Sequence, residues 1–458
     1  MKKTLNYLII PIALITLTIG CDDLLNLAPK SEVGANGFYK NADEVESAVV
    51  AIYDGLQAIP EREFALTEMR SDNTKTKSSE GQFAQFERFE VEPTNGIVAN
   101  HWAFNYNVIF RSNTVLENLD VVINTSRKNQ FEGEAKFNRA LGHFNLVRAF
   151  GDVPLVDRVI GPTDTDYFVR INSDIVYDAI VSDLEDAVTL LPGKSDMDFG
   201  RATSGAAKAL LAKVYLHTGD YASAETLLED LINGTEYGLE PDYRDVFYNE
   251  GNDEIIFAIP YINDDEQESQ DFSFEMTAGG VRSGLNYLTN DFIQAIDPND
   301  TERTPVLRSQ TNDVEVGKFI TSSSNVRFGG NDWIVLRLAD VYLMHAEAIM
   351  AGASSTQNIS AIQSYNAIRN RVGMSTLAED GSATLTLEEL MHERRIELAF
   401  ENHRLYDLVR TGLAIQELSD FASALSYPFT SNDLLLPIPQ SERNVSEGLL
   451  TQNPGYQQ

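Results

Sequence analysis

Residues 211–231 read LAKVYLHTGDYASAETLLEDL, which predicts two helices joined by a tight turn at Gly219-Asp220. Apolar residues recur every three or four positions on each side of this turn, which is the period of an α-helix. A small residue at Ala224 would let the two helices cross closely, as they do in a tetratricopeptide repeat. The pattern is carried by Leu211, Tyr215, Gly219, Tyr221, Ala224, Leu228 and Leu231. The stretch therefore predicts a helical hairpin.

Related spacings recur elsewhere in the chain, so the hairpin is predicted to belong to a stack. The second-helix pattern reappears at Ile180, Leu184, Ala187 and Pro192, and again at Ala361, Tyr365 and Ile368. Periodicity and capping residues predict further helices after the Asn41 cap, over 98–119, over 133–150, from the Asn172-Ser173 cap to Pro192, and over 333–350. We expect a mainly α fold built on a tetratricopeptide-like scaffold of helical hairpins.

Two stretches depart from this helical pattern. The first, residues 235–330, is rich in Asn, Asp, Gly and Ser and contains short apolar runs such as residues 255–259. This composition predicts a loop-rich insertion with short strands. The second, residues 421–458, contains Pro437, Pro439 and Pro454 and is predicted to be irregular. The expected organisation is helical repeats over 37–234, the insertion over 235–330, and a C-terminal helical part with its tail over 331–458.

The composition argues against several classes of partner. The 458 residues correspond to about three average domains or to one long solenoid. The chain has 35 basic and 69 acidic residues, and its net charge of −34 would repel a nucleic-acid backbone. One cysteine and six histidines leave no basis for a disulfide framework or a Cys- or His-rich metal centre.

The N-terminus has the pattern of an export signal. Lys2 and Lys3 precede an apolar run, residues 5–19, which is too short to span a bilayer comfortably. The run ends at Gly20-Cys21, an arrangement similar to a bacterial lipobox. We predict a signal peptide over 1–20, a lipid on Cys21 and a tether over 21–36, with the lipid as the only membrane anchor. The alternative is a plain signal peptide followed by an incidental cysteine.

Short motifs spread over the chain resemble those of one protein family. They are Trp102-x3-Tyr106 with Arg111-x-Asn113, residues 150–155 (FGDVPL), residues 336–342 (LRLADVY) with 346–348 (AEA), residues 393–398 (ERRIEL), residues 404–410 (RLYDLVR), residues 436–439 (LPIP) and residues 453–456 (NPGY). Their order resembles the SusD/RagB family of Bacteroidetes outer-membrane lipoproteins. The Asp22-Asp23 pair after the cysteine is similar to the surface-export signal of such lipoproteins.

The resemblance implies an α-helical, tetratricopeptide-like fold and a nutrient-binding role on the outer face of the outer membrane. It also implies a partner, a SusC-like TonB-dependent transporter that the protein would cap as a lid, usually for glycan import. Two alternatives stay open. One is a peptide ligand, as in the RagB branch, and the other is a protein-interaction scaffold, because tetratricopeptide repeats commonly bind proteins.

The sequence offers no convincing catalytic, cofactor or metal site. Residues 392–396 begin like a zinc-protease helix, but Ile396 stands where the second histidine ligand is needed. Asp196-x-Asp198-x-Gly200 lacks the other oxygen ligands of a calcium loop. The mixed charges between Glu393 and Arg410 could form a carboxylate-pair active site or an ion-pair network. We favour the network, because opposite charges recur at i, i+3 and i+4.

The predicted ligand contacts are aromatic plates and neighbouring polar side chains, which suit the C–H faces and hydroxyls of sugars. Trp102 and Asn107 resemble the Trp and Asn that contact glycan in the starch-binding founder of the family. If the segment is helical, the two lie about 140° apart and can serve one ligand only if the helix starts near Trp102. Packing is the alternative for Trp102, and helix core for the phenylalanines. The predicted set is Arg70, Asp72, Asn73, Phe83, Phe86, Trp102, Asn107, Asn286, Tyr287 and Phe328.

Overall fold

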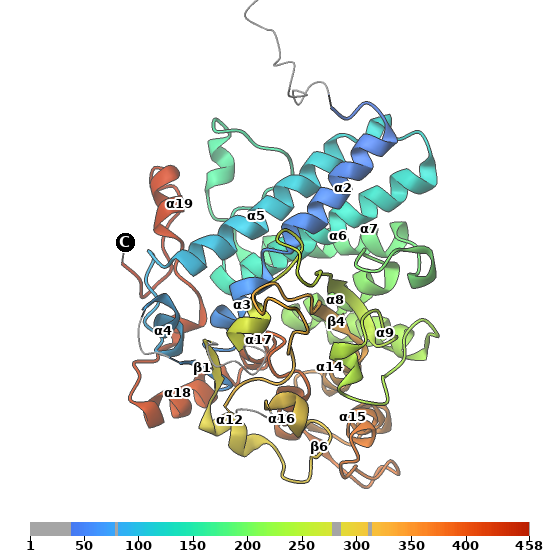
Figure 1. Cartoon of the computed structure of the whole chain (residues 1–458), viewed down its shortest axis with the longest axis vertical. Helices are drawn as coiled ribbons and strands as arrows, with labels where there is room; N and C mark the ends of the chain where they lie inside the picture. The colour runs from blue at the N-terminus through green and yellow to red at the C-terminus, as the bar shows by residue number, and fades with distance from the viewer. Residues whose placement is uncertain (1–37, 78–80, 277–284, 310–313, 458) are drawn as a thin grey trace, which may run out of the picture.

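The computed structural model describes residues 38–77, 81–276, 285–309 and 314–457 (Figure 1). The predicted signal peptide, Cys21 and the tether lie outside these ranges. Helices dominate the described residues, as predicted, and the strands form two-stranded sheets. No described helix has both the length and the apolar character needed to cross a membrane.

The N-terminal helices pack side by side in one layer, visible at the top of Figure 1. They are α2 (Ala42–Leu56), α5 (Gly96–Glu117), α6 (Thr125–Phe150) and α7 (Ser173–Leu190). Asn41 caps α2 as predicted, because its side chain accepts hydrogen bonds from the amides of Asp43 and Glu44. Gly142 lets α5 and α6 approach closely, since a Cβ there would lie 3.2 Å from the Asn105 carbonyl oxygen.

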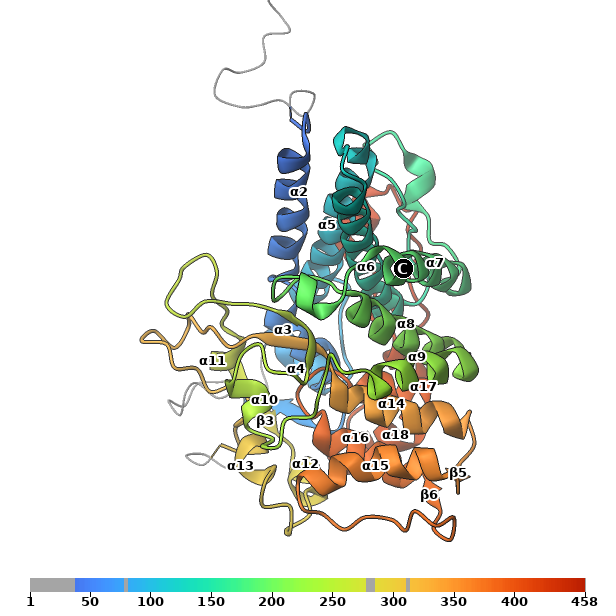
Figure 2. The same ribbon diagram turned by 90° about the vertical axis from the view of Figure 1, so that its right-hand side faces the viewer.

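The predicted hairpin is present and continues the stack (Figure 2). It consists of α8 (Ser204–Thr218) and α9 (Tyr221–Asn233), followed in space by α14 (Leu338–Met350) and α15 (Ile359–Arg371). Gly219 ends α8 in the left-handed conformation, and Asp220 caps α9. The periodicity thus identified the helical pairs correctly.

Two predicted helix boundaries were wrong. Residues 333–337 form strand β4 (Trp333–Arg337), because they pair antiparallel with β2 (Ile255–Ile259) in the insertion. Pairing with a distant strand overrode the helical period there. Helix α6 starts at Thr125 rather than 133, because Asn124 caps it and its polar first turns lie at the surface.

Ala224 provides a direct test of the hairpin packing. Its side chain is fully buried in α9, between α8 and α14. We expect Ala224→Phe to destabilise the protein by about 1–3 kcal/mol, because a benzyl group would overpack this crossing. Ala222→Phe, on the exposed side of the same helix, is the matched control and should change little. Equal denaturation midpoints for the two variants would contradict this packing.

The remaining elements are short and surround this stack. The other sheets pair β1 (Thr74–Thr76) with β3 (Asn286–Leu288), and β5 (Ser355–Thr356) with β6 (Leu385–Thr386). The other helices are α3 (Pro60–Thr67), α4 (Gly81–Glu87), α10 (Asp245–Tyr248), α11 (Phe272–Met276), α12 (Asn290–Ala295), α13 (Thr304–Leu307), α16 (Leu387–Glu397), α17 (Arg404–Arg410), α18 (Ala414–Leu425) and α19 (Gln440–Val445). The last two interrupt the tail that was predicted to be irregular.

The charged run of residues 393–410 is an ion-pair network, as the favoured interpretation held. Arg394 on α16 donates to both oxygens of Asp407 on α17 at 2.9 Å. Arg410 donates to both oxygens of Glu347 at 2.7 Å. Each of these four side chains is at most 6% exposed, and the paired charges join the C-terminal helices to α14.

Candidate functional site

Three predicted ligand contacts are buried in structural interactions instead. Arg70 donates to the carbonyl oxygens of Leu66 and Asp433, at 3.2 and 2.5 Å. Asn73 accepts a hydrogen bond from Arg395 at 2.9 Å. The third is Asp72, and each of the three residues is at most 3% exposed. They join residues 70–73 to the C-terminal part, which accounts for their polar character without a ligand.

Asp72 is held in the same network as a carboxylate. It accepts two hydrogen bonds from Arg404, at 2.9 and 2.7 Å, and lies 3.2 Å from Arg395. Burial alone would raise its pKa, but the two guanidinium groups outweigh burial and lower the pKa to about 2. The Asp72 carboxylate, which the sequence suggested as a partner for a sugar hydroxyl, is thus already paired with Arg404 and Arg395.

The other predicted aromatic contacts are divided among different elements. Phe86 is fully buried, so it belongs to the core, which was the alternative interpretation. Phe83 is half-buried, and the centre of its ring lies 5.9 Å from that of Phe64, on which it stacks. Tyr287 is half-buried in β3, and Asn286 beside it is buried. Phe328 is half-buried in the insertion, where its carbonyl oxygen accepts a hydrogen bond from the amide of Asp264.

Trp102 and Asn107 point to different sides of α5. The helix begins at Gly96, close to the predicted start at 98, so the condition for a shared ligand, a helix start near Trp102, is not met. Trp102 is 4% exposed and packs against Phe150, with ring centroids 5.0 Å apart. Asn107 is exposed on the side of α2, where its Oδ1 would lie 3.4 Å from a Cβ at Gly55. The two side chains therefore cannot share one ligand.

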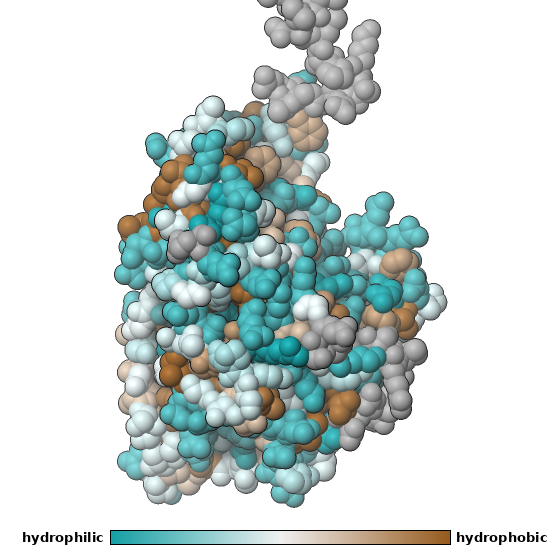
Figure 3. All heavy atoms as spheres, turned by 90° about the vertical axis from the view of Figure 1, so that its left-hand side faces the viewer, coloured by the Kyte–Doolittle hydropathy of each residue, from teal (hydrophilic) through white to brown (hydrophobic). Residues whose placement is uncertain are grey.

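Trp102 instead contributes to the base of a surface cavity of about 260 Å³, which we call the aromatic pocket. Helix α5 supplies Trp102, Tyr106 and Phe110, which stand one turn apart on a single face. The segment after α6 and the tail supply the opposite walls. The lining residues are Trp102, Ala103, Tyr106, Phe110, Pro154, Val156, Arg158, Ile160, Tyr167, Phe168, Glu442 and Leu450. Figure 3 shows hydrophobic residues gathered at the upper left of the face that carries this pocket.

The wall formed by residues 153–171 is a loop closed at its base. Val153 and Ile171 pair in an antiparallel bridge, and the Ile171 amide donates to the Val153 carbonyl oxygen at 3.0 Å. The loop is attached to α5 because the Tyr106 hydroxyl donates to the Pro154 carbonyl oxygen at 2.8 Å. Burial raises the pKa of Tyr106 well above its usual value, so this donor keeps its proton. The Tyr106 ring and the base of the loop are therefore fixed to each other without a ligand.

The tail closes the third side of the pocket. Arg170 donates to the Asp152 carbonyl oxygen at 2.7 Å and to Asn453 Oδ1 at 2.5 Å. The Asn453 amide in turn donates to the carbonyl oxygens of Phe150 and Leu436, at 2.9 and 2.7 Å. These bonds place Glu442 and Leu450 beside α5. The motifs at residues 150–155 and 453–456 thus meet in space although about 300 residues separate them.

The rim of the pocket combines an aromatic ring with charged groups. The Arg158 guanidinium lies 4.8 Å from the centre of the Tyr167 ring and donates to its hydroxyl at 3.1 Å. That hydroxyl donates to Asp157 at 3.0 Å. Phe110 is 48% exposed, and Tyr167 and Phe168 are half-buried. The pocket thus offers aromatic surface to a C–H face and polar atoms to hydroxyls.

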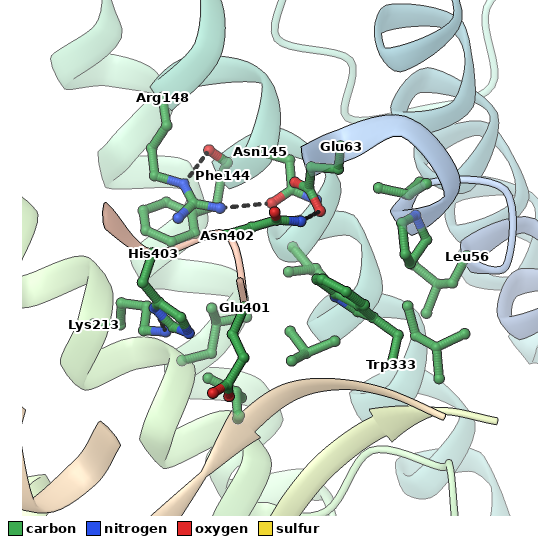
Figure 4. A pocket seen from close by; sticks show the side chains of 17 residues that line it. Leu56, Glu63, Phe144, Asn145, Arg148, Lys213, Trp333, Glu401, Asn402 and His403 are labelled. Atoms are coloured by element: carbon green, nitrogen blue, oxygen red, sulfur yellow. Dashed lines mark hydrogen bonds between the residues drawn. The ribbon is translucent and has the colours of Figure 1, made fainter. Parts of the chain in front are cut away.

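A second cavity, of about 60 Å³, lies inside the protein (Figure 4). Arg148 donates to Asn145 at 2.8 Å, and Asn402 donates to Glu63 at 3.0 Å across it. Its size suits a few ordered water molecules, at about 10–15 Å³ each. Its polar lining residues are Glu63, Asn145, Arg148, Lys213, Glu401, Asn402 and His403. We assign it a structural role, because these groups bond one another across the helical layers.

Sequence reasoning missed the 153–171 wall of the aromatic pocket. The segment has no helical or strand period, and its residues were quoted only in the FGDVPL motif. The one available signal was the cluster of Arg158, Tyr167 and Phe168 in a loop, because a guanidinium beside aromatic rings in a loop is typical of a binding surface.

Comparisons with known proteins agree with this fold. Residues 296–456 match the family described as "SusD family", and residues 25–216 match the one described as "Starch-binding associating with outer membrane". A curated relative, SusD-like protein P2 of Formosa agariphila, is 26% identical over the whole of both chains. A solved structure, "Laminarin binding SusD-like protein", is 28% identical with a TM-score of 0.76, and covers 91% of this chain and 100% of its own.

A further solved structure shows the same fold at lower identity. Surface glycan-binding protein A from Bacteroides thetaiotaomicron is 22% identical, with a TM-score of 0.78 over 91% of this chain and 100% of its own. The fold and the two matched segments together define an α-helical binding protein. The chain belongs to the SusD-like family.

Proposed function

We propose that this protein is a cell-surface lipoprotein that binds oligosaccharide and does no chemistry on it. The observation that carries the proposal is the aromatic pocket, where Phe110 of α5 and two rings of the 153–171 loop are partly exposed beside the Val153–Ile171 bridge. The laminarin-binding relative and the starch-binding description of the matched family support a glycan ligand.

The charge of the protein favours a neutral glycan. A net charge of −34 would oppose approach of a sulfated or uronic acid polymer. The rim offers one guanidinium, Arg158, which is already paired with Asp164 at 3.0 Å. The pocket is therefore suited to uncharged hexose units that stack on Tyr167 and Phe168.

Tyr167 is the residue whose loss should affect binding most cleanly. We expect Tyr167→Ala to weaken glycan binding by about tenfold, equivalent to about 1.4 kcal/mol, because a partly exposed stacking ring is removed. Calorimetric titration of the mature protein with laminarihexaose and maltoheptaose would measure the effect. A peptide library titrated in parallel tests the RagB-type alternative.

Tyr167→Phe is the matched control, because it keeps the ring and removes only the hydroxyl bonded to Arg158 and Asp157. We expect it to keep most of the affinity. Equal affinities for wild type and Tyr167→Ala would show that the glycan binds elsewhere. Binding of peptides and of neither oligosaccharide would overturn the glycan proposal.

We further propose that Cys21 carries the lipid that holds the protein on the outer face of the outer membrane. The support is the Gly20-Cys21-Asp22-Asp23 sequence and the matched family's association with the outer membrane. Several acyl chains on one cysteine anchor firmly, whereas one anchors weakly. Cys21→Ala should release most of the protein into the soluble fraction. Retention of this variant after a high-salt wash would contradict the anchor.

The same proposal includes a partner, a SusC-like TonB-dependent transporter that receives the glycan while this protein acts as its lid. The support is membership of the SusD-like family and the motifs shared with it. Co-purification of an affinity-tagged mature protein with an outer-membrane barrel from the native membrane tests the partnership. Recovery of the tagged protein alone under mild detergent would contradict it.

A further inference from the structure

A groove lies between α16 and the α17–α18 pair, at the end of the molecule away from the N-terminal helix layer (Figure 1). We call it the C-terminal groove. Its volume is about 830 Å³, which is within the size range of ligand-binding cavities. None of its lining residues belongs to the aromatic pocket, so the groove is a separate feature of the surface.

One wall of the C-terminal groove is a single face of α16. Leu387, Met391 and Arg395 stand at successive turns of this helix, with Glu388 and His392 beside them. At about 1.5 Å per residue, the wall from Leu387 to Arg395 is about 12 Å long. An extended peptide covers that length with about four residues.

The opposite wall repeats the combination of an apolar and an acidic side chain. Leu413 precedes α18, and Glu417 follows it one turn later. Leu413 and Leu387 are both half-buried, so each presents apolar surface to the groove. Each wall therefore combines an accessible leucine with a carboxylate.

Two of the carboxylates have no counter-charge. Glu388 and Glu417 are exposed, and their side chains form no ion pair or hydrogen bond with any residue that the structure describes. Glu389 differs, because its carboxylate accepts hydrogen bonds from the Thr386 amide and hydroxyl, at 2.9 and 2.7 Å. Glu388 and Glu417 are therefore available to pair with a cation from outside.

The two arginines that line the groove already have partners. Arg404 donates to both oxygens of Asp72, at 2.9 and 2.7 Å. Burial alone would lower the pKa of Arg404, but Asp72 raises it, and Glu417 contributes less without bonding to it. Arg395 lies 3.2 Å from Asp72 and donates to Asp291 at 2.7 Å. The two arginines and the two aspartates cancel, so the exposed glutamates give the groove its negative charge.

Charge selects the kind of occupant. A groove with apolar surface and unpaired carboxylates complements a segment that carries both apolar and cationic side chains. A second copy of this chain does not fit, because two molecules with a net charge of −34 repel each other. A basic segment of a different protein satisfies both conditions.

We propose that the C-terminal groove binds an extended segment of a partner protein, about four residues long, in which apolar side chains lie between lysines or arginines. The apolar side chains contact Leu387 and Leu413, and the cations pair with Glu388 and Glu417. The proposal does not depend on the glycan-binding function. Both sites can be occupied together, because they share no lining residue.

Fluorescence anisotropy of the mature protein with a labelled peptide, two leucines between two lysines, tests the groove. We expect Glu388→Lys/Glu417→Lys to weaken binding by about tenfold, because two attractive charge pairs become repulsive. Glu388→Gln/Glu417→Gln removes the charges without repulsion and should give a smaller loss in the same direction. Glu266→Lys/Glu302→Lys is the matched control, since it changes the net charge equally at exposed positions outside the groove and should keep the affinity.

Two further peptides separate the charged contacts from the apolar ones. A peptide with glutamates in place of the lysines should not bind. A peptide with serines in place of the leucines should bind about tenfold more weakly, because it buries no apolar surface. Equal affinities of the serine and leucine peptides would show a non-specific attraction to the acidic protein and would overturn the groove.

The imidazole of His392 gives a readout in the groove itself. His392 is the exposed one of the six histidines, all of which lie in the described residues. Its proton resonance should shift on titration with the lysine–leucine peptide in wild type and in Glu266→Lys/Glu302→Lys. No binding of this peptide, or binding that Glu388→Lys/Glu417→Lys leaves unchanged, overturns the proposal. Self-association of the wild-type chain that the latter variant abolishes would assign the groove to a second copy and overturn the partner segment.

Discussion

Replacing Arg337 by methionine will lower the free energy of unfolding by about 3–5 kcal/mol, because it removes the one cation that pairs with all three buried carboxylates of its network. Arg337 in β4 is 1% exposed. It donates to Glu254 at 2.8 Å, to Glu397 at 2.6 Å, and to both oxygens of Glu401 at 2.7 and 2.8 Å. Methionine keeps the apolar stem, so the change isolates the charge. Denaturant unfolding followed by circular dichroism measures it.

The matched control is Lys208→Met, which breaks a surface ion pair. Lys208 pairs with Asp230 at 2.5 Å, and the Asp230 side chain is 60% exposed. Exposed pairs contribute about 0–1 kcal/mol, because water solvates both charges when they separate. A loss below 1 kcal/mol for Arg337→Met would show that the buried network is not stabilised by this cation.

The network also predicts how acid affects the protein. Burial would raise the pKa values of Glu397 and Glu401. Arg371 and then Arg337 outweigh burial at Glu397, and Arg337 and Lys318 do so at Glu401, so both pKa values lie below the usual range. Their contribution to stability is therefore present above about pH 4 and is lost as the pH falls below it. Arg337→Met should flatten this part of the pH profile, which a series of melting curves from pH 3 to pH 6 would show.

Trp102→Ala is expected to cost about 3–5 kcal/mol of stability, because a nearly buried indole leaves a cavity. The indole packs edge-on against Phe150 and lies 5.0 Å from the Tyr106 ring. Because Tyr106 also holds the 153–171 loop, the aromatic pocket should lose its shape and glycan affinity should fall as well. Parallel melting and calorimetric titration separate the two effects.

Phe110→Ala is the matched control on the same face of α5. Its ring is 48% exposed, so we expect a stability change below about 1 kcal/mol and a loss of affinity only. An unchanged melting curve for Trp102→Ala, together with weaker binding, would show that Trp102 is an exposed ring that contacts the glycan directly. That result would contradict its packing against Phe150.

The helical scaffold was predictable because its signals are local. The Asn41 cap, the turn at Gly219-Asp220 and the apolar period after it depend on residues within four or five positions of one another. Such signals can be read without knowing which distant segments pack against the helix. The same is true of the alternating charges after Glu393, which identified the ion-pair network although its partners Arg303 and Arg337 were not foreseen.

The candidate sites depended on contacts between distant segments. Trp102 could be named from sequence, but the loop and tail that complete its pocket lie about 50 and 340 residues further along the chain. Residues 333–337 became a strand because β2 pairs with them, and Asn107 was separated from Trp102 because α5 starts six residues earlier than their pairing required. Local periodicity specifies which residues share a helix face, whereas only packing specifies what that face meets.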